Sequence, residues 1–467
     1  GMAMGFGKIL THDIYARYIR PQANSREQLF ATRVIIFVSL VVSGWVAAGG
    51  LGSTILTWGF LSMGLRAVVL LLPVSTAPGL TTHWSDALFT TVTSVCVTGL
   101  VTVPTATHWS LFGKCVILVL IEFGGLGIIS CAAGTLLIVG RRISMQTSRL
   151  IAQSYNLDTM DGMASVITRI IKGMLLVEAI GTIPYALVFV PQYGVASGLF
   201  RSVFNAVSCF CNAGMDILGE DSLAPWLTNP IININTMLLI ILGSIGFFVW
   251  FDVIDTAKKF RKKGRKPKGF FWQLHLHSRM AIFMTVVLIV GGALCIAVFD
   301  WNNPKSLGTL SVPDKIMAAC FQSVTTRTAG FQTIPQQNFT DASGFISLLL
   351  MFIGGSPMGT AGGMKTTTIA VIFLTMTAYV RGRENTELYN RRLRPSDVRT
   401  AMVVLSLGFS IAFVGTVALS AVTGAGAMDV LFEVISAVGT VGLSRGLTST
   451  LGVAGKLIII AIMYCGR

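Results

Sequence analysis

The chain has 467 residues, of which 53% are hydrophobic and only 12% are charged. Soluble domains carry about twice that share of charged residues, so the composition excludes an ordinary soluble protein and indicates lipid as the solvent. The net charge of +15 would suit a nucleic-acid-binding protein, but the basic residues gather in three short loops between apolar runs. Such loops mark the cytoplasmic side of a membrane protein, and we expect no nucleic-acid partner.

The N-terminal region is basic from Arg17 to Arg33, ahead of the first apolar run. Residues 34–73 are mostly apolar, but they are broken by glycines at 49, 50 and 52. Two spans there would place the basic terminus outside the cell, against the charge rule. We therefore expect a cytoplasmic N-terminus with an interfacial helix within residues 1–49, followed by one span near residues 50–73.

Apolar runs long enough to cross a bilayer recur along the chain. Examples are Cys115–Gly140, Ile231–Val253, Met280–Phe299 and Met402–Val422. Four times, a spanning run is followed by a shorter, half-apolar segment and then by a second apolar run. These short segments are Asp86–Leu100, Leu199–Met215, Lys315–Phe331 and Asp429–Leu443. Each ends in glycine and a bulky apolar residue, and the glycines are 115, 116 and 112 residues apart, which indicates internal repetition.

The short segments nearly keep a common register. The residue ten positions before each glycine is Phe89, Phe204, Cys320 or Phe432. Segments of this length fit re-entrant helices, because non-helical backbone at membrane depth must be buried in protein or line a watery path. The predicted fold class is an all-α integral membrane protein with four repeats of helix, pore helix, filter strand and helix around a pseudo-fourfold pore. The expected repeats are residues 50–140, 141–255, 256–380 and 381–467.

The strands that end in glycine have the features of a cation filter. Backbone carbonyls can replace the hydration shell of a potassium ion, and glycine permits the geometry that points successive carbonyls inward. The alternative is that each strand is a helix C-cap ending in glycine, but four such ends in register favour a filter. The candidate ligands are the carbonyls of Cys96, Val97, Thr98, Gly99, Cys211, Asn212, Ala213, Gly214, Arg327, Thr328, Ala329, Gly330, Gly439, Thr440, Val441 and Gly442.

A glycine-rich stretch, residues 353–365, interrupts an apolar run between residues 344 and 380. Five glycines and one proline predict a break in a helix there, placed to obstruct the pore beneath the third strand. The alternative is a connector between two half-helices. A phosphate-binding loop is excluded, because Met364 separates the last glycine from the lysine. The candidate gate residues are Gly354, Gly355, Ser356, Gly359, Thr360, Gly362, Gly363 and Lys365.

Four motifs carry a resemblance to a known family. They are Val97-Thr98-Gly99-Leu100, Asn212-Ala213-Gly214, Arg327-Thr328-Ala329-Gly330-Phe331 and Thr440-Val441-Gly442-Leu443. With Leu72-Pro73 and Gly124-Gly125-Leu126-Gly127, they resemble the Trk/Ktr/HKT superfamily of cation transporters, nearest to the bacterial Ktr membrane subunit. The resemblance covers the chain from about residue 50 to its end and implies four helix–pore loop–helix repeats in one polypeptide.

The resemblance also implies a function. The transported ion would be potassium, with sodium as a candidate stimulating ion; plant relatives with serine at the first filter glycine favour sodium, whereas this chain has Gly99. The glycine-rich stretch would be the gate. The pore subunit would be a homodimer in the lipid of the cell membrane, above a cytosolic nucleotide-binding regulatory ring of the RCK type. The chain lacks a G-x-G-x-x-G fingerprint, so that ring would be a separate protein.

Charges near apolar spans need an explanation, since burying one costs about 2.5–3.5 kcal/mol on insertion scales. Arg327 lies within the third short segment, and we expect it to brace the strand through carbonyls or a carboxylate such as Glu433. Lys365 and Arg467 are expected to flank the gate; the alternative is that they reach to an interface as long basic side chains often do.

The acidic residues fall into two groups. Asp86, Asp216 and Asp429 are near the outer ends of the short segments, where they would raise the local cation concentration, although Asp86 and Asp429 would equally suit helix N-caps. Glu122 and Glu178 are expected to be buried and structural, with ion coupling as the alternative.

Two competing functions stay open. A sodium- or proton-coupled potassium symporter would use titratable groups near the membrane midplane, for which Glu122 and Glu178 are the candidates. A membrane enzyme using Cys211 or a histidine would need a catalytic triad or a metal cluster, which the sequence does not offer. We therefore expect no enzyme and no covalent cofactor. The eight cysteines form no C-x-x-C pair, so we expect them to serve in packing.

Overall fold

The computed structural model describes residues 66–127, 163–219, 221–262, 269–383, 385–388 and 391–467. Most of the span expected near residues 50–73 and the basic loop from Arg141 to Arg149 lie outside the described residues. In the described part the chain is helical, apart from connecting loops and a short antiparallel pair of strands, β1 (Glu387–Leu388) and β2 (Arg391–Arg392). The all-α fold class predicted from the sequence is confirmed.

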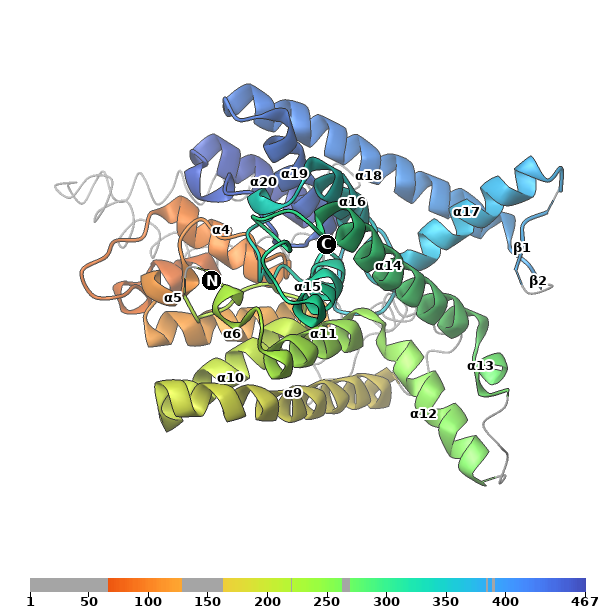
Figure 1. The fold of residues 1–467 in the computed structure, drawn as a ribbon, viewed down its shortest axis with the longest axis horizontal. Helices are drawn as coiled ribbons and strands as arrows, with labels where there is room; N and C mark the ends of the chain where they lie inside the picture. Colours follow the sequence, from red (N-terminus) through yellow and green to blue (C-terminus); the bar gives the residue numbers. More distant parts are fainter. Residues whose placement is uncertain (1–65, 128–162, 220, 263–268, 384, 389–390) are drawn as a thin grey trace, which may run out of the picture. The chain divides into compact units, whose positions relative to one another are not determined.

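In the described residues, every repeat contributes a short helix and a helix after it, and the second, third and fourth repeats also show the helix before it (Figure 1). The short segments form four pore helices: α4 (Trp84–Val95), α10 (Val195–Phe210), α15 (Val312–Thr325) and α19 (Ala427–Gly439). The helices before them are α9 (Met163–Tyr193), α14 (Leu276–Asp300) and α18 (Pro395–Val422). The helices after them are α6 (Leu111–Leu126), α11 (Pro230–Ser244), α16 (Asp341–Phe352) and α20 (Val453–Gly466).

The remaining helices and 3-10 turns connect these. They are η2 (Pro73–Ser75), α5 (Thr105–His108), η3 (Ala224–Trp226), α12 (Phe247–Lys262), α13 (Phe270–Gln273), η4 (Gln336–Asn338), α17 (Thr366–Val380) and η5 (Thr448–Thr450). Several helix starts are fixed locally: the hydroxyl of Ser110 accepts from the N–H of Gly113 at the start of α6, and the hydroxyl of Thr340 accepts from Ser343 at the start of α16.

The packing order of the helices is cyclic. Each pore helix packs against the helix that ends the preceding repeat, which gives the pairs α10 with α6, α15 with α11, and α19 with α16. The last helix of the chain, α20, packs against the first pore helix, α4. The fourth repeat therefore closes onto the first, and one polypeptide surrounds a single axis.

The outer helices expose apolar side chains. Among the described residues, three helices could cross a membrane by length and composition, namely α9 from Val166, α14 and α18, and the bent pair α11–α12 would make a fourth. On α14, the side chains of Phe283, Val290 and Leu294 are 55%, 51% and 61% exposed. Apolar faces of this size suit lipid and not water.

One predicted span is not straight. Residues 231–253 form a continuous apolar run, but the structure divides them between α11 and α12, which meet at 95°. Gly246 lies between the two helices with φ +98°, and the N–H of Phe247 donates to the carbonyl of Met358 in the glycine-rich stretch. The bend is therefore held by a contact that is distant in sequence.

Candidate functional site

The four strands that follow the pore helices share one backbone conformation. Their glycines, Gly99, Gly214, Gly330 and Gly442, have φ of +90°, +63°, +80° and +95°. Two positions earlier in each strand, Val97, Asn212, Thr328 and Thr440 also have positive φ, between 50° and 66°. Non-glycine residues rarely adopt this region, so its recurrence in four strands shows that the repeats are alike at the level of single residues.

The four glycines lie around one centre. A methyl group added to Gly99 would collide with the carbonyl oxygen of Ala213, and one added to Gly214 would collide with that of Ala329. A methyl group on Gly330 would likewise collide with the carbonyl oxygen of Val441, and one on Gly442 with that of Thr98. Each strand thus touches the next, and the four strands form a closed ring. At the four glycines the ring has no room for a side chain.

The third repeat differs by one residue. In the other repeats, the residue before the glycine donates its N–H to a carbonyl five residues earlier, whereas Ala329 donates to Thr325, four residues earlier. Four positions before the residue with the accepting carbonyl lies a phenylalanine in every repeat. In the third repeat this residue is Phe321, and not Cys320, and it corresponds to Phe89, Phe204 and Phe432. All four phenylalanines are at most 1% exposed. The common register seen in the sequence is therefore real, with one residue fewer between the phenylalanine and the glycine in the third repeat.

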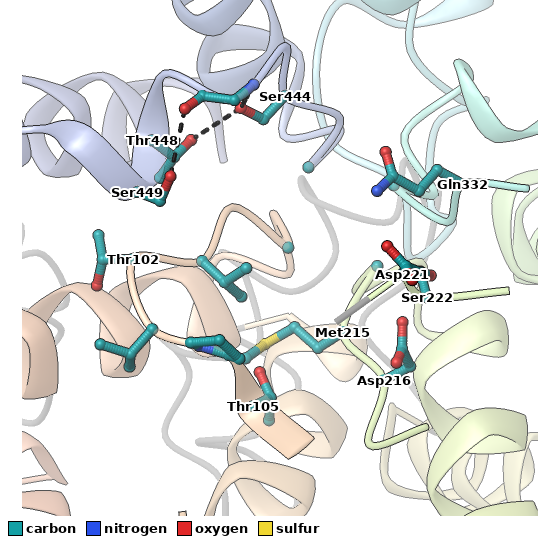
Figure 2. A pocket seen from close by; sticks show the side chains of 18 of the residues that line it. Thr102, Thr105, Met215, Asp216, Asp221, Ser222, Gln332, Ser444, Thr448 and Ser449 are labelled. Atoms are coloured by element: carbon teal, nitrogen blue, oxygen red, sulfur yellow. Dashed lines mark hydrogen bonds between the residues drawn. The ribbon is translucent and has the colours of Figure 1, made fainter. Parts of the chain in front are cut away.

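A cavity of about 340 Å³ opens on one side of the ring, lined by the four glycines and by residues that follow them. Figure 2 shows Thr102, Asp216, Gln332 and Ser444, one from each repeat, around this space. Asp216 lies in the loop after the second strand, and burial raises the pKa of its carboxyl although it accepts a hydrogen bond from the N–H of Leu218. The cavity places polar and acidic groups above the ring.

The glycine-rich stretch lies on the other side of the ring. It has no helix between Phe352 and Thr366, as predicted, and Ile353 pairs with Met364 in an isolated parallel bridge. The hydroxyl of Thr360 donates to the carbonyl of Phe210, the last residue of the second pore helix, at 3.0 Å. A methyl group on Gly362 would collide with the hydroxyl of Thr440 in the fourth strand.

The stretch is also tied to the ends of other helices. Its backbone N–H groups at Ser356 and Thr360 donate to the carbonyls of Ser244 and Gly243 at the end of α11. These α11 contacts are not evident from the sequence, because no local signal links residue 243 to residue 360. The stretch therefore contacts the second and fourth repeats together.

Two cations hold this stretch, as the sequence suggested. The Nζ atom of Lys365 donates to the carbonyl of Ala361 at 2.7 Å. The guanidinium of Arg467 donates to the carbonyl of Thr360 and, at 2.5 Å, to that of Gly124 in α6. The last residue of the chain thus joins the glycine-rich stretch to the first repeat.

The expected contact between Arg327 and Glu433 is not formed in the described part of the chain. Arg327 is 1% exposed, and its Nε and Nη2 atoms have no hydrogen-bond partner among the described residues. Glu433 instead accepts from the hydroxyl of Ser444 at 3.0 Å. Among the described residues, Glu433 therefore does not brace the third strand through Arg327.

Two of the outer aspartates form ion pairs. Asp86 and Asp429 lie in the first turns of their pore helices, but neither is the N-cap residue. The Oδ1 atom of Asp429 lies 2.8 Å from Nε of Arg445, and that of Asp86 lies 2.6 Å from Nζ of Lys456. Neither basic partner is evident from the sequence, because Lys456 is far from Asp86 along the chain and Arg445 lies in a loop.

The structure brings together three groups that lie far apart in the sequence: Cys211 and Glu178 are buried, and Glu122 is half-buried. The thiol of Cys211 is 3.8 Å from Oε2 of Glu122 and 3.8 Å from Oε1 of Glu178. All three donor atoms lie within 4.8 Å of one another, so this cluster could hold a proton or a cation. Gly125 makes room for it, because a methyl group there would collide with the sulfur atom of Cys211.

Comparisons with known proteins agree with this architecture. A family model described as TrkH, a cation transport protein, matches residues 54–467. The chain is 38% identical over 408 residues to the Ktr system potassium uptake protein B of Bacillus subtilis, covering 87% of this chain and 88% of the relative. It is 36% identical over 403 residues to the potassium/sodium uptake protein NtpJ of Enterococcus hirae, covering 85% of this chain and 86% of the relative.

A solved structure is similar as well. The crystal structure of the potassium transporter TrkH from Vibrio parahaemolyticus matches with a TM-score of 0.66 and covers 100% of this chain and 94% of that one. The sequence identity is 18%, so this likeness bears on the fold alone.

Proposed function

Because the chain belongs to the TrkH family of cation transport proteins, we propose that it forms a potassium-selective pore for uptake across the cell membrane. The observation that carries the proposal is the closed ring of four glycine strands. Its carbonyl oxygens come from one polypeptide, and each lies beside the glycine of a neighbouring strand. Carbonyls placed in this way can replace the water lost by a dehydrated potassium ion without any fixed charge.

The sixteen carbonyls from Cys96 to Gly99, Cys211 to Gly214, Arg327 to Gly330 and Gly439 to Gly442 are the proposed ligands. The glycine-rich stretch is the proposed gate, since it lies beneath the ring and contacts Thr440 and Phe210. Movement of this stretch away from α6 would break the link that Arg467 makes between Thr360 and Gly124. The membrane potential supplies about 2.3 kcal/mol per charge per 100 mV, which is enough to drive accumulation through an open pore.

The assembly is proposed from the same family relationship. The name of the Bacillus subtilis relative describes one protein of a Ktr system. We expect this chain to form a homodimer, with a cytoplasmic N-terminus and a separate cytosolic regulatory subunit of the RCK type. The basic residues after Arg381 are suited to the cytoplasmic side by the charge rule.

The proposal is tested by reversal potentials of the purified protein in proteoliposomes. A Gly99→Ser variant should lose preference for potassium over sodium, since its side chain would collide with Ala213. Gly291→Ser is the matched control, because it lies within α14 with open space around it. A potassium preference that is the same in wild type and Gly99→Ser would count against the filter.

A second candidate function is coupled symport with sodium or protons. The observation that favours it is the cluster of Glu122, Glu178 and Cys211, whose carboxylate oxygens and sulfur atom lie within 4.8 Å of one another. The Enterococcus hirae relative is named as a potassium/sodium uptake protein. Coupling would shift the potassium reversal potential when pH or sodium is changed, whereas a simple pore would follow the potassium gradient alone.

A further inference from the structure

Each pore helix carries a hydroxyl residue at the same place. These residues are Thr93, Ser208, Thr325 and Ser436, all with 0% exposure, and each lies four positions after the buried phenylalanine of its repeat. The carbonyl of each accepts the N–H of the residue that precedes the filter glycine. The position is therefore defined by the fold and is occupied by serine or threonine four times out of four.

All four hydroxyls bond to the backbone of their own strand, but in two ways. In the first and fourth repeats the hydroxyl oxygen accepts the N–H of the glycine: Gly99 donates to Thr93 at 3.0 Å and Gly442 donates to Ser436 at 3.1 Å. In the second and third repeats the hydroxyl donates to the carbonyl of the residue after the glycine, and in the second the oxygen of Ser208 also accepts the N–H of Met215 at 3.2 Å. Ser208 donates to Met215 and Thr325 donates to Phe331, both at 2.5 Å.

These bonds have consequences for the carbonyls that face the axis. The N–H and C=O of a trans peptide point in opposite directions. When the N–H of Gly99 or Gly442 is held toward its pore helix, the carbonyl of Thr98 or Val441 must therefore point away from that helix. These are two of the oxygens that lie beside the glycine of a neighbouring strand. In the other two repeats, the hydroxyl turns the carbonyl after the glycine back toward the pore helix.

We infer that Thr93, Ser208, Thr325 and Ser436 are positioning residues that fix the filter and determine its preference for potassium over sodium. This inference rests on the proposed function. The two bonding patterns also make the repeats differ at the outer end of the ring. The carbonyls of Met215 and Phe331 are bound by hydroxyls of their pore helices, so they do not face the ion. Selectivity then depends on a set of side chains that never touch the ion.

The test uses pairs of hydroxyl residues on the same pore helix. Thr93→Val and Thr91→Val both remove a fully buried hydroxyl from α4, but that of Thr91 donates to Ala87 within the helix. Ser208→Ala and Ser202→Ala form the same comparison on α10, where Ser202 donates to Gly198. The measurements are the potassium-to-sodium permeability ratio and the melting temperature of each purified variant.

We expect Thr93→Val and Ser208→Ala to lower the permeability ratio about threefold to tenfold, the scale of one lost hydrogen bond. Thr91→Val and Ser202→Ala should keep the ratio, whatever they do to the melting temperature. Thr93→Ser, which retains the hydroxyl, should have the wild-type permeability ratio. If Thr93→Val does not fold, Ser436→Ala, which removes a single oxygen atom, carries the same test.

Two outcomes would overturn the inference in different ways. If Gly99→Ser lowers the ratio while Thr93→Val and Ser208→Ala leave it unchanged, the hydroxyls are structural and the filter stands. The inference also fails if Ser202→Ala and Thr91→Val lower the ratio as much as their partners do. If Gly99→Ser leaves the ratio unchanged too, the filter itself is wrongly assigned.

Discussion

The Nζ atom of Lys456 lies 2.6 Å from the Oδ1 atom of Asp86 and so joins the last helix of the chain to the first pore helix. Both side chains are 13% exposed, and the hydroxyl of Thr102 donates to the same oxygen at 2.6 Å. The pair lies at the place where the fourth repeat meets the first, a junction that no connecting loop spans in the described residues.

We predict that Lys456→Met lowers stability by about 1–3 kcal/mol, somewhat less than the loss of one partner from a fully buried pair. The uncompensated carboxylate of Asp86 is the physical cause. Thermal unfolding in detergent measures the effect, and the double variant Asp86→Asn/Lys456→Met should lose less than the two single losses combined. Asp429→Asn is the control, because its ion pair with Arg445 lies within one repeat and is more exposed. Equal melting temperatures for wild type and Lys456→Met would contradict this role.

Gly362→Ala should raise the rate of potassium uptake. Its methyl group would collide with the hydroxyl of Thr440 and push the glycine-rich stretch away from the ring. The Thr440 hydroxyl has no hydrogen-bond partner among the described residues, so Thr440→Ala in the same protein should relieve the collision and restore the wild-type rate. Tracer uptake in proteoliposomes measures this. Gly408→Ala on α18, where neighbours lie at ordinary contact distance, is the control. A slower rate in Gly362→Ala would argue that the stretch is a connector and not a gate.

Potassium uptake should depend on external pH through Asp216. Burial raises the pKa of this carboxyl, so protonation removes its negative charge at pH values above the ordinary aspartate range. As the pH falls through that raised pKa, the cavity attracts cations less, and the KM for potassium should rise about threefold, as expected for one charge several ångströms away. Asp216→Asn should raise the KM at neutral pH and remove this part of the pH dependence. Asp221→Asn, on the same cavity, is the control; an unaltered pH profile in Asp216→Asn would remove Asp216 from the mechanism.

Glu122→Gln separates a pore from a coupled transporter. If the protein is a pore, the substitution keeps uptake within about twofold and leaves the reversal potential at the potassium value, because a neutral amide of the same shape can replace a structural carboxyl. If the cluster with Glu178 couples transport, wild type responds to sodium or pH and Glu122→Gln does not. Reversal potentials at two pH values and two sodium concentrations, measured on both proteins, decide between these results.

Much of the architecture could be predicted because it repeats. The glycine spacing indicated four related strands, and the short segments became pore helices with those strands at their ends. The break between residues 353 and 365 was also predictable, since glycine and proline disfavour helix locally. In each case the signal lies within a few residues of the feature that it predicts.

Other features depend on contacts between distant residues. The bend at Gly246 accompanies contacts with residues 357 and 358, and residues 231–253 alone read as one straight helix. The cluster of Cys211 with two glutamates joins three different helices or strands. The shorter third repeat was obscured because Cys320, and not Phe321, stands ten residues before its glycine. Such features require the packed fold, in which neighbours in space need not be neighbours in the chain.

The missing residue in the third repeat has a genetic consequence. In a channel made from four identical subunits, one codon change alters every side of the pore at once, and a deletion in the filter would appear four times. Here a single mutation changes one quarter of the ring and leaves three quarters intact. Natural selection can therefore change the preference between ions in small steps, by altering one repeat at a time.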